Sequence, residues 1–390
     1  MKTFHKIFYH FLRLIIVPYK ALFTNYSWKM YRPKSKTYMV LANHNTNTDF
    51  FLVGVAFFRH MYFVASEHLY RLGFASVLIK FLQHPIPRKK GADAGDTVQM
   101  IKQRLAEGSN ICMFVEGNRS YFGETGWISG TNGHLVKECG AGLITFATHG
   151  GYFKSPRWAS EKRKGPTWGA VVHEYTPEEL AAMTADEITE AIRRDLYVNA
   201  YEDKPAPYPC KHQAETLETA LLVCPECHAI STLKSSGEHF CCTKCGMKLR
   251  LNRYNRFEAD DGKPKFETII DWGHWQQKYL EEQIRELPAG SCALLFGDDG
   301  LDLREVVEGK KTPPLCTGKL SMFADRLEFD GGEMKLIFPV KEIEKMSVAM
   351  VSTLLFTASG KYYEIKASGQ PYSAIKYMMA WRFLNGKEYV

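Results

Sequence analysis

The sequence predicts an α/β domain that follows N-terminal amphipathic helices and precedes a small four-cysteine module and an antiparallel β domain closed by a helix. Three observations lead to this fold class. Apolar runs of strand length alternate with runs of helix length through the first half of the chain, which is typical of α/β domains. Two Cys-x2-Cys pairs follow, and short alternating segments separated by turn residues fill the last hundred residues. The expected parts are 1–35 (helices), 36–205 (α/β domain), 220–252 (cysteine module), 253–289 (helical connector) and 290–390 (β domain).

The N-terminal arm holds the basic character of the chain. Its first 48 residues contain eight Lys and Arg residues and no Asp or Glu, whereas the net charge of all 390 residues is +7. Apolar residues repeat at helical spacing from residue 4 to residue 15, and Pro18 is expected to end or kink this helix. A second short segment, 21–32, adds Trp28 and Tyr31, which favour a membrane interface. The apolar side consists of Phe4, Ile7, Phe8, Phe11, Leu12 and Ile15, and the polar side of Lys2, Lys6, His10 and Arg13.

Basic amphipathic helices of this kind are typical of segments that lie in the surface of an anionic bilayer. The alternative is a helix that only packs on its own domain. The chain has no run of about eighteen uncharged apolar residues that would span a membrane. Its N-terminus also lacks the small-residue cleavage site of a secretory signal. We therefore expect a peripheral or monotopic protein on the cytoplasmic face of a membrane, with anionic lipids among its partners.

Each element of the α/β domain has its own signal. Buried strands are expected at 37–43, 110–117 and 142–148, a buried helix at 74–82, an amphipathic helix closed by glycine at 97–108 and a capped helical pair at 176–201. Residues 202–209, "EDKPAPYP", are expected to form a linker.

A dense polar block follows the first of these strands. In "LANHNTNTDFFLVG" an aspartate, Asp49, comes five residues after His44. On one continuous helix these two side chains would point away from each other. If they cooperate, His44 must lie in a loop and Asp49 in the first turn of the next helix. A carboxylate that holds one imidazole nitrogen leaves the other free to take a proton from a hydroxyl. The alternative is a surface turn with an incidental histidine.

Two further blocks carry groups suited to phosphate binding. "FVEGNRSYFG" runs from a strand into Glu116, Gly117 and Arg119, where glycine permits close backbone approach and arginine offers a bidentate fork. "HPIPRKKG" ends another apolar segment with Arg88, Lys89 and Lys90. Ligands gather at the carboxyl ends of strands in α/β sheets, so these blocks predict one site. Arg157, in "FKSPRW", is a further candidate for headgroup binding, although a plain surface charge is the favoured interpretation.

The three blocks "NHNTNTD", "IPRKKG" and "FVEGNRS", in this order and spacing, resemble the first signature blocks of the glycerolipid acyltransferases, above all the 1-acylglycerol-3-phosphate (lysophosphatidic acid) acyltransferases. The resemblance covers roughly residues 36–200. It implies that His44 is a general base and that Asp49 orients it. The substrate site that it implies comprises Asn43, Arg88, Glu116, Gly117, Asn118, Arg119 and Ser120.

The sequence departs from the family pattern at a few positions. The third block usually reads Phe-Pro-Glu-Gly-Thr-Arg-Ser, whereas here Val115 replaces the proline and Asn118 the threonine. Thr46 stands where a serine is common, and "GLITFATHGG" lacks the prolines of the fourth block. No catalytic group is removed, but acceptor identity becomes less certain because the substituted positions lie beside the phosphate contacts.

The resemblance implies an O-acyltransferase that makes phosphatidic acid from 1-acylglycerol 3-phosphate. The acyl donor would be a thioester, either acyl-coenzyme A or acyl carrier protein. No serine lies in a Gly-x-Ser-x-Gly context, which favours direct transfer over an acyl-enzyme. Glycerol 3-phosphate or another lysophospholipid is the alternative acceptor. A non-catalytic membrane scaffold is the alternative class, and the intact His44/Asp49 and Glu116/Arg119 sets argue against it.

The cysteine module predicts a zinc ribbon. Two Cys-x2-Cys pairs separated by fourteen residues supply four thiolates for tetrahedral Zn²⁺ in a structural role. The predicted ligands are Cys224, Cys227, Cys242 and Cys245, with His228 and His239 as bystanders. Cys241, beside Cys242, is an alternative ligand with a less usual spacing. Cysteines at the spacing of metal ligands, rather than in a disulfide pattern, also favour a reducing compartment. A nucleic-acid-binding ribbon is a third alternative, but charge outside the arm is near neutral, so no nucleic acid is expected.

The last hundred residues resemble a pleckstrin-homology or GRAM-like domain. The stretches that carry this resemblance are "GKLSMFADRLEFDG", "LIFPVKEIEKMSV", "TLLFTASGKYYEIKA" and the closing helix. Such folds bind lipids or protein partners, and packing or dimerisation is an equal alternative.

Overall fold

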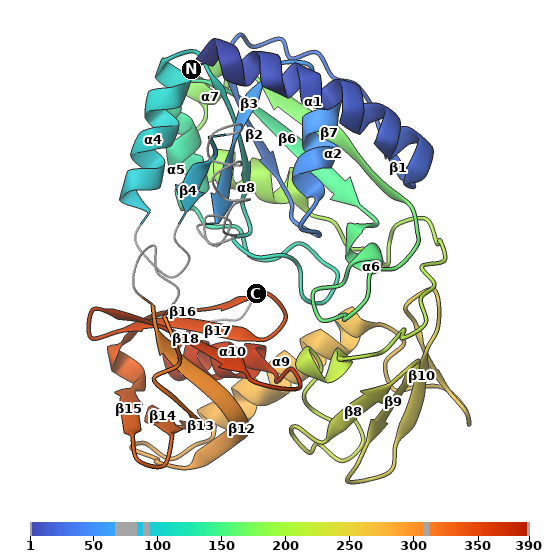
Figure 1. Ribbon diagram of the computed structural model, residues 1–390, viewed down its shortest axis with the longest axis vertical. Helices are drawn as coiled ribbons and strands as arrows, with labels where there is room; N and C mark the ends of the chain where they lie inside the picture. The colour runs from blue at the N-terminus through green and yellow to red at the C-terminus, as the bar shows by residue number, and fades with distance from the viewer. Residues whose placement is uncertain (1, 67–83, 89–93, 307–311, 388–390) are drawn as a thin grey trace. The chain divides into compact units, whose positions relative to one another are not determined.

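The structure is a computed structural model that describes residues 2–66, 84–88, 94–306 and 312–387 (Figure 1). It divides into two compact units. The first comprises Met1–Pro156 and Arg163–Tyr208, and the second comprises Arg157–Lys162 and Pro209–Val390. The finer five-part division of the chain stays a prediction.

A seven-stranded sheet forms the centre of the first unit, with the strand order β1-β7-β6-β2-β5-β3-β4. Strands β6, β2, β5, β3 and β4 run parallel to one another, whereas β7 runs antiparallel to β6 and pairs in parallel with β1. The predicted α/β architecture is therefore observed, with one reversed edge. The strands are β1 (Tyr26–Trp28), β2 (Tyr38–Ala42), β3 (Met61–Ser66), β4 (Ile86–Arg88), β5 (Asn110–Phe114), β6 (Gly142–His149) and β7 (Thr167–Tyr175).

Helices cover both faces of this sheet, which explains why β2 is apolar throughout. Met39 and Leu41 pack into one core, and Tyr38, Val40 and Ala42 pack into another, because successive side chains of a strand point to opposite faces. The first core holds α4 (Gly95–Ala106), α5 (Thr131–Cys139), α7 (Pro177–Ala182) and α8 (Ala185–Leu196), and the second holds α2 (Asp49–Ala56).

The capped helical pair predicted at 176–201 is confirmed as α7 and α8. Each begins with a capping box, formed by Thr176 with Glu179 and by Thr184 with Glu187, in which the threonine and the glutamate satisfy each other's backbone N–H groups. The buried helix predicted at 74–82 lies outside the described residues.

Pro18 was expected to end or kink helix α1 (Lys2–Phe23); the helix continues past Pro18, so the first of these two alternatives is wrong. Proline removes one backbone hydrogen bond, but the helix continues to Phe23. One side of α1 remains exposed and apolar, and it includes four of the six residues of the predicted stripe. The exposed side chains are Phe4 (42%), Ile7 (65%), Phe11 (55%), Leu14 (77%) and Ile15 (54%).

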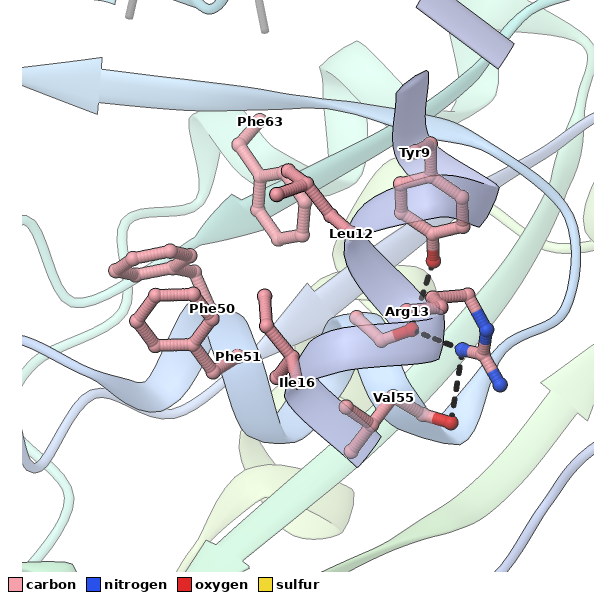
Figure 2. A pocket seen from close by; sticks show the side chains of 9 residues that line it. Tyr9, Leu12, Arg13, Ile16, Phe50, Phe51, Val55 and Phe63 are labelled. Carbon is pink, nitrogen blue, oxygen red and sulfur yellow. Dashed lines mark hydrogen bonds between the residues drawn. The ribbon is translucent and has the colours of Figure 1, made fainter. Parts of the chain in front are cut away.

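The opposite side of α1 binds α2. Arg13 Nη1 donates to the carbonyl oxygens of Gly54 and Val55 at 2.7 and 2.9 Å, and the Tyr9 hydroxyl donates to Gly54 at 2.7 Å (Figure 2). Arg13 Nη1 also donates to the carbonyl oxygen of Phe57 at 2.6 Å. The last carbonyls of a helix lack intrahelical partners, and a cation there also interacts favourably with the helix dipole. Arg13 is therefore not a free cation of the polar face, contrary to the sequence-based interpretation.

The second segment of the arm, 21–32, was expected to join the amphipathic helices, and this is wrong. Beyond Phe23 the chain forms β1, which pairs with β7. Trp28 and Tyr31 pack partly buried against the core that contains α2, and the Tyr31 hydroxyl donates to Glu174 Oε2 at 2.7 Å. Pairing with a distant strand decides this conformation, and local sequence does not reveal such a partner.

The second unit contains two antiparallel sheets and two long helices. One sheet has the order β11-β10-β9-β8, and the other has the order β15-β14-β13-β12-β18-β17-β16, which agrees with the predicted antiparallel C-terminal region. Strand β11 lies beyond residue 252, the expected end of the cysteine module. The elements are β8 (Leu233–Ser236), β9 (His239–Cys242), β10 (Lys248–Leu251), β11 (Phe257–Ala259), α9 (Ile269–Arg285), β12 (Leu294–Glu305), β13 (Cys316–Phe323), β14 (Arg326–Asp330), β15 (Lys335–Pro339), β16 (Ile343–Ala349), β17 (Thr353–Ala358), β18 (Lys361–Ala367) and α10 (Ala374–Leu384).

Arg157 is neither a surface charge nor a headgroup ligand. It belongs to the second unit and is only 3% exposed. Its guanidinium donates to the backbone oxygen of Met350 at 3.1 Å and to that of Val348. The buried guanidinium is thus bound to one backbone carbonyl near the end of β16 and to one in the β16–β17 connection.

Candidate active site

His44 and Asp49 form the pair that the sequence predicts. His44 Nδ1 lies 3.0 Å from Asp49 Oδ2. Strand β2 ends at Ala42, His44 lies in the following loop, and Asp49 is the first residue of α2. The short polar turn between them folds the carboxylate back onto the imidazole, which a continuous helix would not allow.

Protein donors surround the Asp49 carboxylate, which is 1% exposed. Oδ2 also accepts the backbone N–H groups of Asn45 (2.6 Å) and Thr46 (2.8 Å), and Oδ1 accepts the Thr46 hydroxyl (2.5 Å). When Nδ1 of His44 carries the ring proton and donates it in the hydrogen bond to Asp49 Oδ2, Nε2 is unprotonated and able to act as a base.

Glu116 connects the third sequence block to the backbone of His44. Its Oε1 accepts the N–H of His44 at 2.5 Å, and its Oε2 accepts the N–H of Gly126 at 2.7 Å. The Ser120 N–H in turn donates to the His44 carbonyl at 3.0 Å. Removal of water from the Glu116 carboxyl raises its pKa to about 8, although the two N–H donors act in the opposite direction.

The remaining predicted residues divide into two groups. The Asn43 side chain binds the backbone of Thr148, and the Ser120 hydroxyl donates to the Glu124 carbonyl at 2.6 Å. Both polar groups are therefore bound within the fold. Arg88, Gly117, Asn118 and Arg119 are partly or fully exposed. Arg119 also donates to the Ser155 carbonyl at 3.3 Å.

The sheet brings these blocks to one edge. Arg88 ends β4, His44 follows β2 and Glu116 follows β5, and these are parallel strands of one sheet. Ligands of open α/β sheets bind at this carboxyl edge. Lys89 and Lys90, also expected near the site, lie outside the described residues.

Comparison with known proteins identifies the domain that carries this site. Residues 24–148 match the family model described as Acyltransferase. The chain carries an acyltransferase domain. One solved structure that it resembles is the 1-acyl-sn-glycerophosphate (LPA) acyltransferase PlsC from Thermotoga maritima, with 17% identity and a TM-score of 0.41 over 48% of this chain and 78% of that one. The search of curated proteins gives no match.

An apolar pocket is lined by residues of α1, α2 and β3. Its empty volume, including the open mouth, is about 370 Å³. Phe50 and Phe51 directly follow Asp49 in α2, and Phe63 comes from β3 (Figure 2). Sequence reasoning did not single out this pocket, because the aromatic run "DFF" also fits a buried helix face. The lining residues are Tyr9, Leu12, Arg13, Ile16, Phe50, Phe51, Gly54, Val55 and Phe63.

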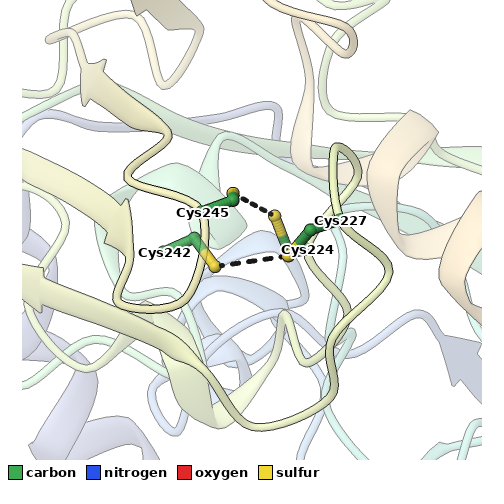
Figure 3. A group of neighbouring side chains, drawn as sticks. All are labelled: Cys224, Cys227, Cys242 and Cys245. Carbon is green, nitrogen blue, oxygen red and sulfur yellow. Dashed lines mark hydrogen bonds between the residues drawn. The ribbon is translucent and has the colours of Figure 1, made fainter.

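The four predicted metal ligands lie together in the second unit (Figure 3). Their sulfur atoms lie within 4.8 Å of one another, with 3.6 Å between Cys224 and Cys245 and 3.7 Å between Cys227 and Cys242. Tetrahedral zinc with bonds of about 2.3 Å requires sulfur atoms about 3.8 Å apart. The donor set therefore fits Zn²⁺. His228 and His239 are outside the group, as predicted, and so is Cys241, the alternative ligand.

Among the helices of the described residues, none is long and apolar enough to cross a membrane.

Proposed function

We propose that the acyltransferase domain moves a fatty acyl group from a thioester to the free hydroxyl of 1-acylglycerol 3-phosphate, giving phosphatidic acid. The observation that carries this proposal is the contact between His44 Nδ1 and Asp49 Oδ2 at 3.0 Å. It leaves the second imidazole nitrogen as a base at the carboxyl edge of the sheet. A base in this position typically contributes about 10²- to 10⁴-fold to the rate.

The proposed reaction needs no covalent enzyme intermediate. His44 Nε2 takes the proton of the acceptor hydroxyl as its oxygen attacks the thioester carbonyl. The carbon–sulfur bond then breaks, and the departing thiolate takes the proton from the imidazolium. Asp49 stabilises that imidazolium and keeps the ring oriented. The donor thiol belongs to coenzyme A or to acyl carrier protein.

The groups around the base suit a phosphate and an acyl chain. Arg88 and Arg119 supply cations at the ends of β4 and β5, and arginine binds phosphate through two parallel hydrogen bonds. Gly117 has φ 69°, and a Cβ there would contact nothing within 4 Å, so a ligand can approach its backbone. The apolar pocket lined by α1, α2 and β3 is the proposed site of an acyl chain, because its lining is mostly aromatic and aliphatic.

The exposed apolar side of α1 supports attachment to a bilayer surface. Both the lysolipid acceptor and the product partition into membranes, so an interfacial helix next to the site would keep the enzyme near them. We propose a peripheral location on a cytoplasmic membrane face. The four-cysteine site would hold a structural Zn²⁺, since four thiolates leave no open coordination position for catalysis.

Glycerol 3-phosphate or another lysophospholipid is the second candidate acceptor. The specific observation in its favour is Asn118, a substitution in the third block that lies partly exposed beside Gly117 and Arg119.

The test is transfer in lipid vesicles with acyl-coenzyme A and 1-acylglycerol 3-phosphate, followed by thiol release and lipid product. Glycerol 3-phosphate serves as the second acceptor in a parallel reaction. His44→Ala should abolish transfer, whereas His134→Ala, at an exposed histidine of α5, should leave it unchanged. Absence of transfer to either acceptor, first from acyl-coenzyme A and then from acyl carrier protein, by folded protein that binds vesicles would contradict the proposal and favour a scaffold.

A further inference from the structure

A chain of hydroxyl groups leads from Asp49 to strand β1. The Thr46 hydroxyl lies 2.5 Å from Asp49 Oδ1 and 3.0 Å from the Thr48 hydroxyl. The Thr48 hydroxyl lies 2.9 Å from the phenol oxygen of Tyr26. Tyr26 is the first residue of β1, which follows α1 directly in the chain. The carboxylate that orients His44 is thus joined to the N-terminal arm.

The Asp49 carboxylate fixes the direction of every hydrogen bond in this series of hydroxyl groups. Thr46 donates its only hydroxyl proton to Asp49. Its oxygen can then only accept from Thr48, and the Thr48 oxygen in turn accepts from Tyr26. All three hydroxyl protons therefore point toward the negative charge. Bonds in such a series polarise and strengthen one another in a site of low dielectric constant.

Neighbouring residues pack against both ends of this series of hydroxyl groups. On the Thr46 side, a Cβ at Gly151 would lie 3.0 Å from Thr46 Cγ2 and 2.9 Å from Asn45 Cβ, so α6 (Gly151–Lys154) packs tightly against the turn. On the other side, Lys154 Nζ lies 4.3 Å from the ring centroid of Tyr26. Burial raises the pKa of Tyr26, which keeps its phenol protonated and able to donate.

We propose that Tyr26 is a positioning residue for the His44–Asp49 pair and acts through the hydroxyls of Thr48 and Thr46. It contacts no reacting atom. It limits the rotation of the Asp49 carboxylate, and through it that of the imidazole. Its effect on turnover rests on the proposed function, whereas its effect on the His44–Asp49 hydrogen bond does not.

The first measurement compares Tyr26→Phe with wild type in the vesicle assay. The variant keeps the ring and removes only the donor. We expect kcat to fall about three- to tenfold, the usual cost of one hydrogen bond, while KM for donor and acceptor stays within about twofold. Tyr31→Phe is the matched control, because it removes a tyrosine hydroxyl that donates to Glu174, and its kcat should not change.

A double-mutant cycle separates positioning from a general loss of structure. Thr48→Val breaks the same chain at the next hydroxyl, so Tyr26→Phe combined with Thr48→Val should cost little more than either change alone. Thr48→Ser retains the hydroxyl and should keep the wild-type kcat. Losses that multiply in the double variant would overturn the proposal.

The low-field proton resonance of His44 Nδ1–H supplies a readout that needs no turnover. We expect this signal to shift and broaden in Tyr26→Phe and to stay unchanged in Tyr31→Phe. If wild type transfers no acyl group but the signal changes as expected, the proposed function fails and the positioning role stands. A signal and a kcat that are both unchanged in Tyr26→Phe would overturn the positioning role.

Discussion

The backbone N–H of His44 lies 2.5 Å from Oε1 of Glu116, so the carboxylate of the third sequence block holds the main chain of the first. The second oxygen of Glu116 accepts the N–H of Gly126 at 2.7 Å. The family resemblance places Glu116 in the substrate site, and in the structure both carboxylate oxygens bind backbone groups. Its direct contacts are thus those of a residue that positions His44.

Replacement of Glu116 by glutamine should change how stability depends on pH. The pKa of Glu116 is about 8 in the folded protein, raised by burial from an ordinary value of 4.5. Folding therefore makes Glu116 bind a proton between these two pH values, so the contribution of Glu116 to stability falls as pH rises from 4.5 to 8, by at most about 1.4 kcal/mol per pH unit. Glu116→Gln removes this slope, and urea unfolding at pH 5.5 and 7.5 measures it.

Glu174 offers a matched control for this measurement. It too accepts backbone N–H groups, from Ser35 at 2.9 Å and Lys34 at 3.1 Å. Burial acts to raise its pKa, but the hydrogen bonds outweigh burial and lower it. Glu174 is therefore ionised in both states above pH 5.5, and Glu174→Gln should leave the slope between pH 5.5 and 7.5 unchanged. Equal slopes in wild type and Glu116→Gln would contradict the raised pKa.

Replacement of Arg13 by leucine should destabilise the first unit. One guanidinium nitrogen donates to three carbonyls at the end of α2, and hydrogen bonds of charged groups contribute about 1.5–3 kcal/mol. We expect a loss in that range by chemical denaturation, with faster hydrogen exchange in α2. Lys6→Leu removes an exposed cation from the same helix and should cost much less. Equal losses of stability in both variants would show that the charge of α1, rather than the hydrogen bonds of Arg13 to the end of α2, decides stability.

Replacement of exposed apolar residues of α1 should weaken vesicle binding. Ile7 and Leu14 are 65% and 77% exposed, so their change to glutamine removes little packing from the folded protein. Burial of each in a bilayer interface is expected to contribute about 1 kcal/mol, so the affinity of the double variant for vesicles should fall roughly thirtyfold. Val172→Gln, at a 48% exposed residue of β7, is the control. Unchanged binding by the double variant would place the membrane contact elsewhere.

The parts of the site that could be predicted are those that depend on residues close together in the sequence. His44 and Asp49 lie five residues apart, and the impossibility of a shared helix face already requires the loop that the structure shows. Alternating strands and helices likewise predicted that the three blocks meet at one sheet edge. The contact between Glu116 and the His44 N–H could not be predicted, because every residue type except proline has a backbone N–H and the sequence does not indicate which of them a side chain binds.

Errors in the predicted fold arose where distant contacts override local pattern. Arg13 follows the polar face of an amphipathic helix, yet the carbonyls at the end of α2 attract it inward. Residues 26–28 form a strand only because β7 pairs with them. Arg157 resembles any surface arginine until the end of β16 and the β16–β17 connection supply its carbonyl partners. A local sequence pattern does not indicate contact partners that lie so far away in the sequence.

The four-cysteine site should bind one Zn²⁺ per chain, and loss of one ligand should release it. Sulfur distances of 3.6 and 3.7 Å match a tetrahedral ion, and metal binding at such sites is coupled to folding. Cys224→Ser removes a buried ligand, and we expect loss of bound zinc and a stability loss above about 3 kcal/mol. Cys241→Ser changes a neighbouring cysteine outside the group and should retain both metal and stability. Elemental analysis and thermal unfolding, with and without a chelator, measure the two effects. Full zinc content in Cys224→Ser would mean that Cys241 or a histidine serves as the fourth ligand, whereas no zinc in wild type would reject the site.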